Sequence, residues 1–133
     1  MVKAVTYILQ NNAAVQALIG HKEQSQTATY YKAYPVVVPE SEKAPYIAVR
    51  LVGKVPGGKN CDFNYTIQVA SFANSYDAVT ALNNAVITAL QDQAAGTVNG
   101  QAFGYLNLTN EADDYVREHN LFSKITTFEG MAD

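Results

Sequence analysis

The sequence predicts a small α+β domain, in which two helices pack on one face of an antiparallel sheet of four to five strands. Three observations predict it. Residues 46–52 and 63–70 alternate apolar and polar side chains, as half-buried strands do, and the turn signal Pro56-Gly57-Gly58 separates them. Residues 2–19 and 75–90 repeat apolar side chains at the helical period. One apolar face on each strand is typical of an antiparallel sheet covered on one side only.

The first helix is expected over residues 2–19. Gly20 follows the last apolar position and is placed to end the helix. The polar pair Asn11-Asn12 falls in the middle, where we expect it to face solvent. The apolar stripe consists of Val5, Ile8, Leu9, Val15, Leu18 and Ile19.

Residues 21–45 are expected to form an irregular arm. Pro35 and Pro39 lack the amide donor, so the apolar triplet between them fits an edge strand or an extended arm better than a central strand. The same arm holds a cluster of tyrosines, Tyr30, Tyr31 and Tyr34. Tyrosine combines apolar area with a polar tip, so these rings fit either an interface or a half-buried sheet surface.

The hairpin at residues 46–70 defines the face that the helices should cover. Gly-Gly can adopt the positive φ values of hairpin turns, and residues 54–62 are expected to form a long tip. The expected helix-covered face carries Ile47, Val49, Leu51, Phe63, Tyr65, Ile67 and Val69. The opposite face of the second strand is polar and carries Asn64, Thr66 and Gln68.

The second helix has a clear start. Ser75 is a good N-cap, and Asp77 in the first turn favours the helix dipole. Two further strands are expected, at 101–109 and 115–128, joined by an acidic turn, and the tail 129–133 is expected to fray. The buried stripe of the helix consists of Val79, Leu82, Ala85, Val86, Ala89 and Leu90.

Composition narrows the class of protein. A chain of 133 residues fits one domain, 1–133, that needs no disulfide or metal to fold. The net charge of −3, with scattered Lys and Arg, argues against phosphate-driven nucleic-acid binding. No apolar run approaches the ~20 residues of a membrane span, and no secretory signal is expected at the N-terminus. These features favour a soluble protein without a membrane partner.

Catalytic groups are scarce. His21 and His119 lie in different elements without neighbours at metal-ligand spacing. Cys61, the single cysteine, has no nearby histidine to activate it, so we expect a structural thiol at a subunit contact. The segment Pro56-Gly57-Gly58-Lys59 lacks the full phosphate-loop spacing and joins two strands. Glu111, Asp113 and Asp114 lack the pattern of a calcium loop and are expected to be solvated. We therefore expect no catalytic residue, no metal site, no cofactor and no enzyme.

Short motifs along the chain resemble one family. They are Val15-Gln16-Ala17-Leu18-Ile19-Gly20, Pro45-Tyr46-Ile47-Ala48-Val49, Val69-Ala70-Ser71-Phe72, Ser75-Tyr76 before the helix 78–90, and Asp113-Asp114-Tyr115. Their order and spacing, from about Val2 to Phe128, resemble the tail completion, or tail terminator, proteins of long-tailed bacteriophages and prophages.

The resemblance implies a structural subunit of the virion, made in the host bacterial cytoplasm. It implies a homo-oligomer, typically a hexameric ring, that caps the tail tube protein and joins it to the head-side connector protein. One alternative is a neck or head–tail connector subunit of a phage or phage-derived device. Another, from a different class, is a small-molecule-binding α+β domain, which would need a concave pocket with convergent polar groups.

The sequence suggests two sets of contact residues. The candidates for subunit or partner contacts are Tyr30, Tyr31, Tyr34, Val36, Val37, Lys54, Gly57, Gly58, Lys59 and Cys61. Asn64, Thr66 and Gln68 would either line a channel or face solvent or a neighbouring subunit. DNA is expected to pass such a ring without specific binding, because tight phosphate binding needs clustered cations that this chain lacks.

Overall fold

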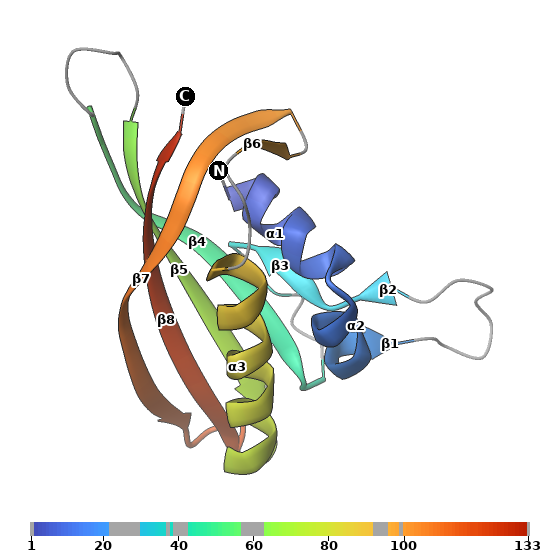
Figure 1. The fold of residues 1–133 in the computed structure, drawn as a ribbon. Helices are drawn as coiled ribbons and strands as arrows, with labels where there is room; N and C mark the ends of the chain where they lie inside the picture. The colour runs from blue at the N-terminus through green and yellow to red at the C-terminus, as the bar shows by residue number, and fades with distance from the viewer. Residues whose placement is uncertain are drawn as a thin grey trace.

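The computed structural model places three helices on one side of a long, twisted sheet (Figure 1). This α+β architecture confirms the fold class. No helix among the described residues is long and apolar enough to cross a membrane. The described residues are 2–21, 30–36, 38, 43–56, 63–91, 96–98 and 100–132.

The helix expected over 2–19 is two helices, α1 (Val2–Asn11) and α2 (Ala13–Ile19). Asn12 separates them because its backbone is extended, with φ −85° and ψ 125°. Its side-chain oxygen accepts hydrogen bonds from the amides of Ala14 and Val15 at 3.1 and 3.2 Å. Asn prefers such N-cap positions to helix interiors, so the expected continuous helix is wrong at this residue. The other helix is α3 (Tyr76–Gln91).

The main sheet has the order β3-β4-β5-β8-β7-β6. Four strands are long, β4 (Tyr46–Pro56), β5 (Phe63–Ala73), β7 (Gln101–Val116) and β8 (Leu121–Ala132). Two short strands extend the edges, β3 (Ala33–Pro35) and β6 (Gly96–Val98). Neighbours pair antiparallel except β3, which pairs parallel to β4, so the sheet is mixed and not purely antiparallel.

The described part of the expected arm 21–45 is more regular than its sequence suggests. β1 (Gly20–His21) and β2 (Tyr30–Tyr31) form a separate two-stranded sheet. The edge strand is present as β3, but it ends at Pro35, before the valines. Val36 continues the contact through its amide, which donates to the carbonyl of Val49 at 2.7 Å.

The core lies between the helices and one face of the sheet. Ile47, Val49, Ile67 and Val69 are fully buried there, as the alternation predicts. Leu51 shares their face but is 44% exposed, so its expected burial is wrong. The reason is a shift of register between Leu51 and Gly53, where β4 continues past the helices. The helices contribute Val5, Leu9, Val15, Ile19, Leu82, Val86 and Leu90.

Two expectations for the C-terminal third are wrong. The acidic segment 110–114 is part of β7, and the turn lies at 117–120, where Asn120 has φ 51°. The tail does not fray over 129–132, because these residues pair with β5 on one side and β7 on the other. Pairing on both sides of a strand satisfies its backbone groups and holds its end in the sheet.

A helix-free face of the sheet as the candidate docking surface

The face of the sheet opposite the helices is the candidate site, and we call it the outer face. Successive side chains of a strand point to opposite faces, so the neighbours of the buried residues in β4, β5 and β8 project outwards. All three helices lie on the other side (Figure 1). The outer face carries Ala48, Arg50, Asn64, Thr66, Gln68, Ala70, Phe72, Ile125, Thr127 and Glu129.

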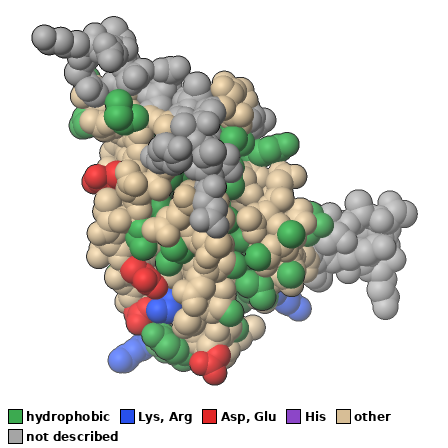
Figure 2. All heavy atoms as spheres, viewed as in Figure 1, with side chains coloured by type: hydrophobic (Ala, Val, Ile, Leu, Met, Phe, Trp, Pro, Cys, Tyr) green, Lys and Arg blue, Asp and Glu red, His purple; other side chains and the backbone are tan. Residues whose placement is uncertain are grey.

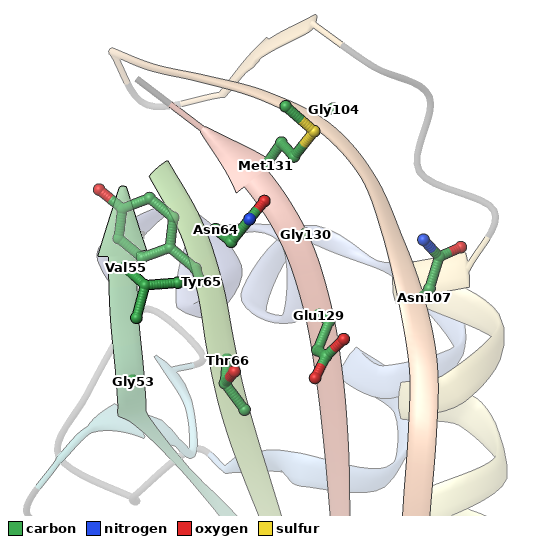
Figure 3. Close-up of a pocket in the computed structure, with 10 residues that line it drawn as sticks. All are labelled: Gly53, Val55, Asn64, Tyr65, Thr66, Gly104, Asn107, Glu129, Gly130 and Met131. Carbon is green, nitrogen blue, oxygen red and sulfur yellow. The ribbon is translucent and has the colours of Figure 1, made fainter. Parts of the chain in front are cut away.

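A large hollow occupies the end of the outer face where Val55 of β4 pairs with Asn64 of β5 (Figure 3). Its volume is about 700 Å³. All four long strands contribute to it, and Met131 extends from β8 towards Gly104 of β7. The lining residues are Gly53, Val55, Asn64, Tyr65, Thr66, Gly104, Asn107, Glu129, Gly130 and Met131.

The chemistry of this hollow suits contact with a protein better than catalysis. Among the described residues that line it, Glu129 is the only charged one, and Asn64, Thr66 and Asn107 add neutral hydrogen-bonding groups. Within the described ranges no three His, Cys, Asp or Glu side chains are grouped as metal ligands. A lone exposed carboxylate among amides and small residues can accept a cation or hydrogen-bond donors from a partner.

A smaller hollow, of about 260 Å³, lies further along the outer face. Arg50 and Gln68 both line this hollow, and Arg50 Nε donates a hydrogen bond to Gln68 Oε1 at 2.6 Å. Val36 lies at its rim and is 64% exposed. The remaining lining is mostly apolar and consists of Ala48, Ala70, Phe72 and Ile125.

On the helix-covered face of the sheet, a cluster of polar side chains links α3 to β7 and β8. Lys124 Nζ donates to Asp113 Oδ1 at 2.7 Å and lies 3.7 Å from Glu111 Oε1. Tyr76 of α3 donates its hydroxyl to Asp113 Oδ2 at 3.2 Å. The hydrogen bond from Lys124 holds the pKa of Asp113 below its usual value, and the same bond raises the pKa of Lys124. The cluster lies on the helix side, because it bonds to Tyr76 and Asn83 of α3. Figure 2 shows acidic and basic side chains next to each other near the lower end of the molecule.

A second link in the same layer joins α3 to both strands. Asn83 is buried in α3 and donates its side-chain amide to Glu111 Oε1 at 2.8 Å. Its side-chain oxygen accepts from Thr126 Oγ1 at 2.5 Å. Because each of these groups is engaged within the subunit, the cluster serves as a structural clamp. The expected solvated acidic turn is thus partly an ion-paired strand.

The residues predicted to make contacts are dispersed. Tyr30 and Tyr31 form β2, and Tyr31 packs against the core while Tyr34 is half-buried in β3. Lys54 is exposed, with its amine 4.1 Å from the centre of the Phe63 ring. Val36 borders the smaller hollow. Val37, Gly57, Gly58, Lys59 and Cys61 lie outside the described residues.

The structure does bring together the polar residues proposed for a channel. Asn64 and Thr66 line the large hollow, and Gln68 lines the smaller one. Sequence reasoning missed the residues opposite them, Glu129 and Met131, because the tail was expected to fray. It missed Asn107 because its pairing with Glu129 joins strands whose partners were not predicted. It also missed Gly53, Gly104 and Gly130, whose position inside strands was the available signal.

The fold is that of a small α+β subunit in which all three helices of the described residues cover one face of the main sheet. The chain belongs to the family described as "Tail completion protein gp17", whose pattern matches residues 3–132. It is therefore a structural tail completion protein of a phage-type virion, as the sequence motifs suggested.

The fold recurs in a solved structure. A chain from the virion of a native gene transfer agent particle is similar over 99% of this chain and 93% of that chain, with a TM-score of 0.69 and 15% identity. At that identity the likeness shows a shared fold. A search of curated proteins found no match.

Proposed function

We propose that six copies of the chain form a ring that caps the tail tube and joins it to the head-side connector. The observation that carries the proposal is the helix-free outer face with its two hollows, in a chain that belongs to the tail completion family. In this proposal the protein acts by binding other subunits, without a catalytic step or a cofactor.

A ring needs contacts between two different surfaces of the same subunit. Such head-to-tail contacts close into a ring when the rotation between neighbours is right, whereas self-complementary contacts stop at a dimer. The two ends of the outer face differ in chemistry, because Glu129 and amides line one hollow and Val36 and Phe72 line the other. This asymmetry supports a head-to-tail arrangement.

DNA would pass through the ring without being gripped. Each subunit carries a formal charge of −3, so a ring of any size is strongly negative and repels phosphate. Asn64, Thr66 and Gln68 suit either the channel wall or a subunit contact. We favour the subunit contact for Asn64 and Thr66, because a concave surface fits a protruding segment of a neighbour.

The family assignment favours tail completion over the alternative of a neck or connector subunit. Deleting the gene in the phage or prophage that carries it separates the two. We expect tails of uncontrolled length and heads that remain unjoined, both corrected by supplying the chain in trans. Tails of normal length with unjoined heads would favour the connector subunit. Normal, joined particles would contradict both.

A further inference from the structure

Two glycines in the large hollow have no role that the isolated subunit explains. A Cβ on Gly53 would lie 3.9 Å from Cβ and Oγ1 of Thr66, and one on Gly104 would lie 3.7 Å from the carbonyl oxygen of Met131. These are ordinary van der Waals distances. Neither residue has a φ in the left-handed region, where among the described glycines only Gly100 is found. Alanine would therefore fit both positions.

Glycine inside a strand weakens it relative to alanine, because glycine loses more conformational freedom on folding. Both glycines lie at shifts of register, Gly53 in β4 and Gly104 in β7. A bulge requires glycine only where φ is positive, so the bulges do not explain the residue type. Strand glycines without a conformational reason mark places where another backbone approaches closely. The hollow is thus shaped for an incoming segment.

We propose that the large hollow receives the β4–β5 connection, residues 57–62, of a second copy of this chain. The proposal rests on the ring proposed above and names its contact. The connection reads Gly57-Gly58-Lys59-Asn60-Cys61-Asp62. Its two glycines allow close backbone approach, and its lysine complements Glu129, the one charged residue among the described residues of the hollow.

The positions of the two partners fit a ring. Val55 and Asn64 line the hollow, and the next residues of the same strands, Pro56 and Phe63, form the last pair before the connection. The hollow therefore lies at the end of the sheet where the chain leaves β4 and returns as β5. In a cyclic ring, neighbours lie at equal heights along the axis, so the connection of one subunit reaches the level of the next hollow. Because the two surfaces differ, the contact repeats head to tail.

Substitution of the glycines tests the shape of the hollow. Gly53→Ala and Gly104→Ala should leave the melting temperature of the subunit unchanged or raised, and should reduce the fraction of assembled ring at least tenfold. Gly100→Ala is the control. Its φ of 80° strains alanine, so it should lower the melting temperature without touching the hollow. Normal assembly of the double variant Gly53→Ala/Gly104→Ala would overturn the proposal.

Disulfide trapping tests the occupant. Thr66→Cys and Glu129→Cys each place a thiol in the hollow opposite the natural Cys61, and Ala81→Cys on the exposed side of α3 is the control. On oxidation the first two variants should give a ladder of covalent multimers on a non-reducing gel, and the control should not. Charge reversal adds a second readout: Lys59→Glu and Glu129→Lys should each impair assembly, and together they should restore it.

The outcomes separate this proposal from the function it rests on. If the wild-type chain forms rings but neither hollow thiol forms a ladder, the docking of the connection is wrong and the ring stands. A bond formed only within one chain would mean that each hollow holds its own connection. If neither rings nor ladders form, even with tail tubes present, both proposals fail.

Discussion

Lys124 and Asp113 face each other across β8 and β7, with 2.7 Å between the amine nitrogen and a carboxylate oxygen. The lysine side chain is only 9% exposed, while the aspartate is more than half exposed. The pair therefore anchors the acidic segment of β7 and, through Tyr76, the start of α3. The hydrogen bond within the pair lowers the pKa of Asp113 and raises the pKa of Lys124, so the stability of this corner depends on pH.

Acid should weaken this corner. The hydrogen bond from Lys124 lowers the pKa of Asp113 from 3.8, so its stabilising effect is present above that value and is lost as the pH falls through the lower pKa of the folded state. Urea unfolding across the acid range should show this loss, and Asp113→Asn should have a flatter acid limb. Identical acid limbs for the two proteins would show that the pair is not responsible.

High pH should destabilise the subunit by removing the proton of Lys124. Its pKa is raised from 10.5, chiefly by the hydrogen bond to Asp113, so the stabilisation is complete below 10.5 and is lost as the pH rises through the higher folded value. The free energy of unfolding should therefore decline above 10.5 in the wild type and less in Lys124→Met. Arg117→Met, at an exposed turn position, is the control and should keep the wild-type alkaline limb.

Core substitutions test the packing of helices on the sheet. Ile67→Ala in β5 and Leu82→Ala in α3 should each cost about 2–5 kcal/mol, because both side chains are fully buried. Leu51→Ala, on the same face but 44% exposed, should cost less than about 1 kcal/mol. Chemical unfolding measures all three. An equal loss of unfolding free energy at all three positions would contradict the finding that Leu51 lies outside the buried core.

Val36 should show opposite effects on folding and assembly. Its φ of 64° is unfavourable for a β-branched residue, so Val36→Gly should stabilise the subunit by about 1 kcal/mol. Removing its exposed side chain from the rim of the smaller hollow should weaken assembly. Val52→Gly, an exposed strand position without a positive φ, should instead destabilise the fold. Loss of stability in Val36→Gly would contradict the strain at this residue.

The assembled ring should not bind duplex DNA tightly. A gel-shift titration at low salt is the most demanding test, because screening is weakest there. We expect no shift beyond weak, non-specific retardation. Tight binding that disappears with added salt would indicate clustered cations at the channel and would contradict passive passage.

Periodicity predicted the main elements because burial follows it directly. Ile47, Val49, Ile67 and Val69 alternate along two strands, and all four are fully buried. The errors arose where a polar residue serves the backbone or pairs at long range. Asn12 caps a helix inside an apparently continuous helical pattern. The local sequence around Asp113 suggests a turn, because its partner Lys124 lies eleven positions later in the chain.

The candidate site was only half predictable. Asn64, Thr66 and Gln68 follow from the polar side of an alternating strand. Glu129 pairs with Thr66 on one side and with Asn107 on the other, across strands that are distant in sequence, and nothing local indicates that pairing. The parallel strand β3 likewise depends on contact with β4 across residues 36–45, which no short-range pattern encodes.

The most direct test of the ring is electron microscopy of purified tail tubes mixed with this chain and then given more tube protein. We expect a sixfold ring at one end of each tube and no further growth from that end. Tubes that lengthen from both ends, with no density for the chain at either, would contradict it.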